Sequence, residues 1–318
     1  MSSAMEEVLV RISGKSDVIN DAKIQKQLTV ARNYLANFRY DASAETLTNV
    51  LGEVVRTKKL VMEFDRLRIK NLLTQSNKPI WDEARPSALI FLAVETSSRR
   101  EIFSSEDSHE FVDALNASAL LKGIPYELPL MDIVDELSIS PSEVWGLFSD
   151  SIETASKRYD HEYTLAGRIY QDSQSLWLSD WLVGGVSKGV RFEVTSDSVE
   201  DLMDQAVGKL ADIMSQQYAV LLSGKPKHQI NIAVTDVRSL DDYHNALSLL
   251  NSMSVIKQAN VTAVDGHNIS YQLNAYSSED LLLSMLGLNQ TNFIQLMNDG
   301  SVVQLQWVAD AEQQQLSQ

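Results

Sequence analysis

Hydrophobic positions along the middle of the chain repeat with strand-like and helix-like periods in alternation, a pattern typical of a sheet with helices packed on it. Seven apolar residues run from Ala88 to Val94, which predicts a strand buried on both faces. Further strands are expected at about 126–131, 163–170, 175–183 and 189–196. The last strand alternates apolar with polar residues, so one face should meet solvent: Val190, Phe192 and Val194 against Arg191, Glu193 and Thr195. We therefore predict a central mixed-sheet α/β domain over residues 86–222.

Capping residues mark where the helices of this domain should begin. Ser140 followed by Pro141 and Glu143 is a capping box with proline at the first helical position. Ser104 with Asp107 carries a similar signal, and a long amphipathic pattern over 197–220 predicts a closing helix. The helix from Ser140 is expected to bury one stripe of side chains: Val144, Leu147, Phe148, Ile152 and Ala155.

Beyond residue 227 the order of elements is strand, helix, strand, strand, helix, strand. The expected ranges are 229–236, 240–253, 255–265, 268–276, 278–287 and 301–308. The Asp265-Gly266 step marks a tight hairpin between the second and third strands. This order is that of the split βαβ, ferredoxin-like fold. We predict such a domain over residues 227–310, followed by a polar, Gln-rich and disordered tail over 311–318.

The first 78 residues predict a smaller αβ module. Apolar residues at helical spacing, beginning at Met5, end at Gly14, a natural helix stop. A second helix is expected at about 21–36, a strand at 54–64 and a short helix at 66–74. We interpret residues 1–78 as a ferredoxin-like sandwich that lacks its first strand, because no strand precedes the first helix.

Composition removes several classes of function. With 27 basic and 43 acidic residues the net charge is −16, so the surface should repel nucleic acid and anionic lipid. The absence of cysteine rules out disulfides, thiolate catalysis and cysteine-ligated metals. No run approaches the ~18 apolar residues of a membrane span. No export signal precedes the first helix in the chain as given.

Motifs for cofactors and metals fail in this sequence. Gly14-Lys15-Ser16 ends like a phosphate-binding loop, but the pattern needs glycine at the position held by Leu9. No pair of histidines has the spacing of a metalloprotease site: His109, His161, His228, His244 and His267. We therefore expect no cofactor, no metal and no catalytic residue.

One ligand site follows from topology alone. In open α/β sheets, ligands bind beyond the carboxyl ends of parallel strands. Those ends carry Glu95, Thr96 and Asp132. Two carboxylates brought together could hold a cation or act as an acid/base pair. The alternative is that Asp132 belongs to a turn and Glu95 is solvated.

Two tryptophans are candidates for a protein interface. Trp177 and Trp181 are four residues apart on one predicted strand, so they share a face. If they are exposed, they would anchor a protein partner. If they are buried, they belong to the core.

Several short segments resemble a family called domain of unknown function 2066, over most of residues 1–220. The shared segments are Val8–Gly14, Phe38–Tyr40, Pro79–Trp81, Arg85–Pro86, Phe91–Glu95, Leu128–Asp132, Val144–Gly146 and Tyr159–Arg168. The resemblance implies an exported envelope protein without established catalytic residues, with a signal peptide and an extra strand that this sequence lacks. The central module also looks similar to the small protein-binding domains of periplasmic assembly proteins, such as the amino-terminal domain of the Tol-system propeller protein.

These observations lead to one expected function and two alternatives. We expect a non-enzymatic periplasmic protein that binds protein partners or serves as a scaffold. The first alternative is a small-ligand-binding, metal-binding or hydrolytic protein that uses Glu95 and Asp132. The second is a cytoplasmic protein of unrelated role, if the start at Met1 is genuine.

Overall fold

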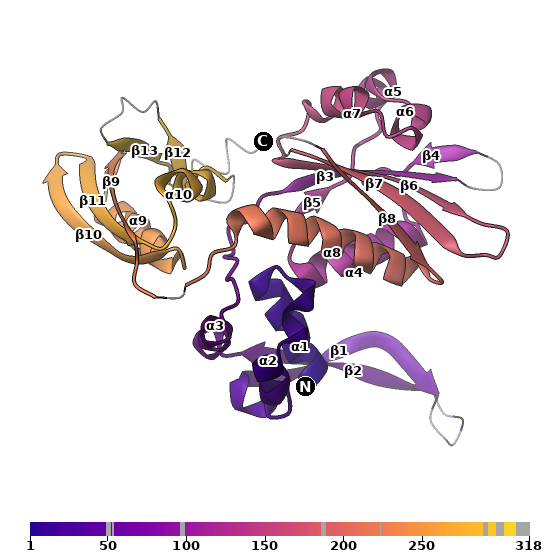
Figure 1. Ribbon diagram of the computed structural model, residues 1–318, viewed down its shortest axis with the longest axis horizontal. Coiled ribbons are helices and arrows are strands. Elements are labelled where there is room, and N and C mark those ends of the chain that lie inside the picture. The colour runs from indigo at the N-terminus through magenta and orange to yellow at the C-terminus, as the bar shows by residue number, and fades with distance from the viewer. Residues whose placement is uncertain are drawn as a thin grey trace.

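The computed structural model describes residues 1–48, 52, 54–95, 99–185, 189–222, 224–288, 292–296 and 302–309. Within these residues the chain forms ten α-helices and three sheets, each antiparallel or mixed (Figure 1). The multi-module α+β architecture predicted from the sequence is therefore confirmed. The exact boundaries between modules stay a prediction.

The central sheet is mixed, as predicted. Its strands are β3 (Ala88–Glu95), β4 (Arg100–Ile102), β5 (Tyr126–Glu127), β6 (Tyr163–Gln171), β7 (Trp177–Gly184) and β8 (Val190–Ser196). They lie in the order β4-β3-β6-β7-β8, and β5 pairs with β3 outside that path. β3 runs parallel to β5 and β6, whereas the β3–β4, β6–β7 and β7–β8 pairs are antiparallel.

Helices cover both faces of this sheet (Figure 1). One face packs against α4 (Glu110–Lys122) and α8 (Val199–Tyr218), and the other against α5 (Ile133–Ser138), α6 (Pro141–Trp145) and α7 (Ser149–Ser156). Along β3, Ile90 and Leu92 belong to the first core, and Leu89 and Phe91 to the second. The strand is therefore buried on both faces, which is why its sequence is apolar without alternation.

The helix start predicted at Ser104 and Asp107 is wrong. Asp107 Oδ2 accepts hydrogen bonds from the Ser104 N–H (2.7 Å) and hydroxyl (2.9 Å), which closes a turn instead of capping a helix. α4 begins only at Glu110, with His109 as its N-cap. The polar pair predicted a helix wrongly because the same hydrogen bonds stabilise isolated turns.

The capping box of Ser140 and Glu143 is confirmed, but the single long helix expected after it is wrong. The chain breaks after α6, where Leu147 adopts a left-handed φ of 50°. α7 starts anew at Ser149, and Phe148, expected in the buried stripe, is exposed. The break between α6 and α7 changes the direction of the chain, so the side chains after it do not continue the helical spacing of those before it. Periodicity alone could therefore not place Phe148.

The C-terminal module has the predicted ferredoxin-like topology. Its elements are β9 (His228–Thr235), α9 (Leu240–Ser252), β10 (Ile256–Asp265), β11 (Asn268–Ala275), α10 (Glu279–Leu286), β12 (Phe293–Gln295) and β13 (Val303–Trp307). The sheet order is β10-β11-β9-β13-β12, with β9 and β13 parallel at its centre. The short edge strand β12 was not predicted. The tail over 311–318, predicted to be disordered, lies outside the described residues.

The N-terminal module is built on helices and one hairpin. Its elements are α1 (Ser2–Ser13), α2 (Ala22–Leu28), β1 (Leu35–Thr48), β2 (Val54–Phe64) and α3 (Arg66–Gln75). The helix expected at 21–36 is shorter because the β-branched pair Thr29-Val30 follows α2, and such residues favour extended geometry. β1 and β2 form a two-stranded sheet in the described residues, so this module is not a complete ferredoxin-like sandwich.

A buried arginine joins the N-terminal module to the central one. Arg85 donates hydrogen bonds to the carbonyl oxygens of Lys122 (2.7 Å), Asp82 (3.1 Å) and Arg11 (2.5 Å). Its guanidinium also lies over the ring of Trp81, 4.2 Å from the centroid. Because these carbonyls belong to α1, to the junction and to the end of α4, one side chain fixes the positions of three segments.

The helix stop predicted at Gly14 is confirmed, and it also forms a packing contact. Gly14 caps α1 with a φ of 66°, and its carbonyl accepts a hydrogen bond from the Ser215 hydroxyl of α8 at 2.8 Å. A Cβ on Gly14 would lie 2.5 Å from the Ser215 Cβ. Glycine therefore allows α1 to pack closely on α8.

We predict that Arg85→Leu destabilises the protein by about 3 kcal/mol or more, because a buried carbonyl without a donor costs roughly 1–3 kcal/mol. Urea unfolding followed by circular dichroism measures the change. Arg238→Leu is the matched control, since the Arg238 side chain is 64% exposed and its loss should change stability by less than about 0.5 kcal/mol. Equal losses in both variants would contradict the role given to Arg85.

Candidate protein-interaction site

Helix α5 shows the reverse of the usual burial pattern. Its apolar residues Ile133, Val134 and Leu137 are 75%, 54% and 84% exposed, whereas Asp135 is 3% exposed. Surface helices normally bury their apolar residues and expose their charges. Together with the neighbouring exposed Leu130, these three side chains form an outward apolar surface, which we call the α5 patch.

The orientation of α5 is fixed by the hydrogen bonds of the buried Asp135 carboxylate. It accepts hydrogen bonds from Arg158 Nη1 at 2.8 Å, from the Met131 N–H at 2.9 Å and from the Tyr159 hydroxyl at 2.5 Å. A buried charge is tolerated when it is paired and hydrogen-bonded in this way. Turning the apolar face of α5 inward would therefore leave all these donors without their acceptor.

Asp132, the N-cap residue of α5, also holds this helix in place. Its carboxylate caps α5 by accepting the N–H groups of Val134 (3.0 Å) and Asp135 (3.1 Å). Arg158, which follows α7, binds the same carboxylate through both terminal nitrogens, at 2.5 and 2.7 Å. Hydrogen bonds from Arg158, and then from the backbone, hold the pKa of Asp132 well below its usual range. α5 is thus attached to the segment after α7 by a bidentate ion pair.

The structure does not join the two carboxylates that the sequence suggested as a ligand site. Asp132 caps a helix, and Glu95 ends β3 in an ion pair with Arg100 at 2.9 Å. Thr96, the third candidate, lies outside the described residues. The strand expected at 126–131 is only Tyr126–Glu127, paired with the first residues of β3, because Pro129 lacks the N–H that a ladder requires. The carboxyl end of β5 therefore does not lie beside Glu95.

Trp177 and Trp181 share a face of β7, and that face packs against α4 and α8. Trp181 is fully buried, and its Nε1 donates to the Ser179 hydroxyl at 2.7 Å. Trp177 is partly buried, with its ring edge-to-face with Phe111 at 5.1 Å. The arrangement matches the core alternative, and Trp181 offers no surface to a partner.

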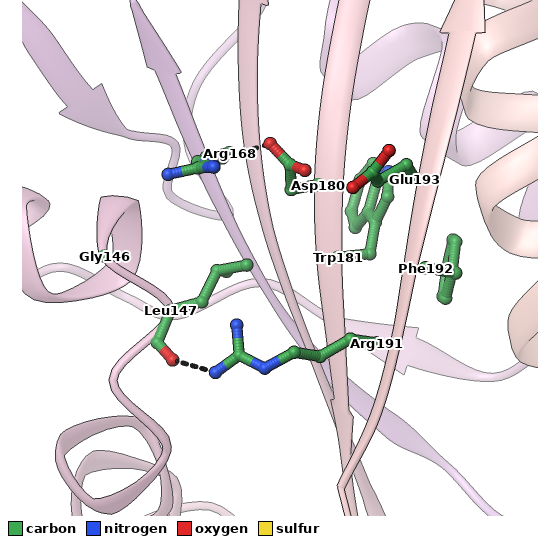
Figure 2. Close-up of a pocket in the computed structure, with 8 residues that line it drawn as sticks. All are labelled: Gly146, Leu147, Arg168, Asp180, Trp181, Arg191, Phe192 and Glu193. Carbon is green, nitrogen blue, oxygen red and sulfur yellow. Dashed lines mark hydrogen bonds and ion pairs between the residues drawn. The ribbon is translucent and has the colours of Figure 1, made fainter.

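A polar cavity of about 510 Å³ lies where the turn after α6 faces β6, β7 and β8 (Figure 2). Arg168 and Asp180 form an ion pair at 2.7 Å beside it, and Arg191 donates to the Leu147 carbonyl at 2.8 Å. Glu193 also lines the cavity, and within the described residues its carboxylate forms no ion pair or hydrogen bond. The wet face predicted for β8 is confirmed by the exposure of Arg191 and Glu193.

Metal ligands and membrane-spanning helices were considered only for the residues that the structure describes, 1–309 without the gaps given above. No group of three or more histidine, aspartate or glutamate side chains there is placed to hold a metal ion. Among the helices in the same residues, none combines the length and the apolar character needed to cross a membrane.

Comparison with known proteins gives one family match. Residues 1–82 match a family described as "Domain of unknown function (DUF8605)". No curated protein matches the sequence. Two crystal structures of Staphylococcus aureus homoserine dehydrogenase show weak similarity. The first, at pH 6.5, is 15% identical over 34% of this chain and 28% of that chain, with a TM-score of 0.14.

The second, at pH 7.5, is 12% identical over 56% of this chain and 48% of that chain, with a TM-score of 0.15. The chain therefore covers less than half of either enzyme chain. Scores this low support no conclusion about fold or function.

The resemblance to domain of unknown function 2066 is wrong as a family assignment, because the matching family is a different one. Three of the segments that suggested it, among them Val8–Gly14 and Phe38–Tyr40, lie inside the 1–82 match. Such short segments follow general helix and strand patterns, so they do not distinguish families. The periplasmic location inferred from the resemblance stays a prediction.

We expect Asp135→Asn to loosen α5. In the variant an amide NH2 group replaces one carboxylate oxygen. This group is itself a donor and cannot accept the hydrogen bonds that the oxygen accepted, which should cost about 1–3 kcal/mol. Hydrogen exchange should speed up over residues 130–138, and urea unfolding should show lower stability. Glu136→Gln, at the exposed neighbouring position, is the control and should leave both measurements unchanged. Unaltered exchange in Asp135→Asn would show that this carboxylate does not hold the helix.

The lowered pKa of Asp132 predicts a pH dependence with a definite sign. A carboxyl group whose pKa is depressed by folding stabilises the folded state above its unfolded pKa of about 3.9, and this contribution is lost as pH falls through the folded pKa. Asp132→Asn should therefore melt at a lower temperature than the natural protein at pH 7. The difference should begin to shrink below about pH 4. A difference that stays constant on acidification would contradict this account of Asp132.

Proposed function

We propose that this chain is a non-enzymatic protein-interaction or scaffold protein and that the α5 patch is its principal docking surface. The observation that carries the proposal is the outward placement of Ile133, Val134 and Leu137 around a buried aspartate. Burying a leucine or isoleucine fully contributes about 1.5–3 kcal/mol. The patch therefore offers a partner substantial binding free energy that the isolated chain does not use.

The partner should present an apolar groove with basic residues at its rim. A short helix that lays its apolar side chains into a groove is a common mode of recognition. Glu136 is exposed on α5 beside the patch, and the whole chain carries a net charge of −16, so basic residues at the rim would complement it. The bonds of Asp132 and Asp135 hold α5 in place before binding, which reduces the entropy lost on association.

The N-terminal hairpin supports the same function. Phe38 and Tyr40 are exposed on β1, and their cross-strand neighbours on β2 are Met62 and Leu60. Residues directly opposite each other share a face, so one face of the hairpin is apolar and open to solvent. Exposed apolar surfaces of this kind commonly mark sites of protein contact.

The ligand-binding or hydrolytic alternative has no observation in its favour. It requires Glu95 and Asp132 to act on one molecule, and each carboxylate is bound to its own arginine. The held carboxylate of Asp132 serves as a helix cap, which explains its position without a ligand.

The proposal predicts that Leu137→Asp weakens partner binding by at least about tenfold, equivalent to ~1.4 kcal/mol, without loss of fold. A photo-crosslinking residue at position 137 identifies the partner, and calorimetry with the purified partner then gives the Kd of the natural protein and the variant. The matched control is Leu67, which is 74% exposed on α3. A crosslinking residue at position 67 should not capture the partner, and Leu67→Asp should leave the Kd unchanged. Equal crosslinking at the two positions, or an unchanged Kd in Leu137→Asp, would overturn the proposal.

A further inference from the structure

Strand β8 leaves one edge of the central sheet open. It is the last strand in the sheet order, and within the described residues it forms a ladder with β7 alone. The backbone N–H and C=O groups along its other edge can pair with a further strand. Natural proteins usually block such an edge, so the side chains along β8 decide what can pair there.

The charged side chains of β8, Arg191 and Glu193, can pair with charges on another chain. Asp180 lies opposite both Arg168 on β6 and Glu193 on β8, and it forms its ion pair with Arg168. Among the described residues, no lysine or arginine forms an ion pair with Glu193. Arg191 donates a hydrogen bond from one terminal nitrogen to the Leu147 carbonyl, and its other N–H groups can donate to a further acceptor.

We infer that a second copy of this chain pairs with β8 along this edge, antiparallel and with the two-fold axis at Phe192. In that register Arg191 of each copy lies opposite Glu193 of the other, so both charges are neutralised on the same face. Phe192 faces its own counterpart, and Val190 faces Val194. The contact is isologous, which is the usual form of a homodimer interface.

The registers next to this one, and the parallel arrangement, are unfavourable. An axis at Arg191 or at Glu193 places like charges directly opposite each other, and a parallel arrangement does the same at both positions. A shift by one residue places Arg191 opposite Phe192, whose ring packs against Trp181 on the other face of the sheet at 6.2 Å. The order Arg191-Phe192-Glu193 therefore favours the axis at Phe192 over these arrangements.

The dimer would have a single sheet that continues through both copies. Its two-fold axis would be perpendicular to that sheet, so both copies would turn the same face to the same side. α5, α6 and α7 cover one face of the sheet (Figure 1). Arg191 lies on that face, because it is opposite Leu182, which belongs to the core under α6 and α7, and Glu193 is two residues along the same strand. The two α5 patches would therefore point to one side. The inference does not depend on the function proposed for α5, but it would make that surface bivalent.

Charge exchange on the full-length protein tests the inference. The natural protein should sediment as a dimer. Arg191→Glu and Glu193→Arg should each weaken self-association roughly tenfold or more, because each places like charges in both cross-strand pairs. The double variant should restore the dimer, and a mixture of the two single variants should form a heterodimer. Glu153→Arg, with a side chain 75% exposed on α7, is the charge-matched control and should stay dimeric.

A cysteine at the axis gives an independent measurement. Since the chain has no cysteine, Phe192→Cys should cross-link only to position 192 of a second copy on oxidation, whereas Leu240→Cys, at an exposed position, should not. A natural protein that stays monomeric would overturn the inference and leave the edge to a foreign strand. Single charge variants that stay dimeric, or a double variant that stays monomeric, would equally overturn it.

Discussion

The buried guanidinium of Arg85 is the contact on which the arrangement of the first two modules depends. Carbonyl groups at the end of α1, in the junction and at the end of α4 have no partner within regular structure, and Arg85 supplies their donors. Burial lowers the pKa of Arg85 to about 10, so the side chain still carries its charge at neutral pH. A planar group with several fixed N–H bonds suits this task because it can bond to several segments at once.

Arg158 fixes the position of α5, as Arg85 fixes the positions of the segments at the junction. It gathers the carboxylates of Asp132 and Asp135, and in doing so it determines which side of a short helix faces the protein. The free energy of hydrogen bonding to a buried carboxylate here outweighs the burial of three aliphatic side chains. The result is a helix with its charged residue inside and its apolar residues outside, which is the surface that the proposed function assigns to a protein partner.

Ion pairing also determines which charges of the central sheet are available to other chains. Arg168 neutralises Asp180, and this leaves Glu193 and Arg191 as the available charges on an open edge. Both the α5 patch and these charges belong to one face of the sheet, and the opposite face is filled by α4 and α8. Both faces of the sheet therefore pack against helices, and the exposed apolar and charged side chains gather on the side of α5, α6 and α7.

The sequence by itself determined the elements with strong local signals. The apolar run of β3, the stop at Gly14, the capping box at Ser140 and the ferredoxin-like order of the C-terminal module follow from periodicity, turn chemistry and capping, which act over a few residues. Only the tertiary structure decided that Asp132 caps α5 in an ion pair with Arg158 and that α5 faces outward. Both outcomes rest on Arg158, which is 26 residues from Asp132 in sequence. A pattern shows which residues alternate, but a distant partner sets which face is buried.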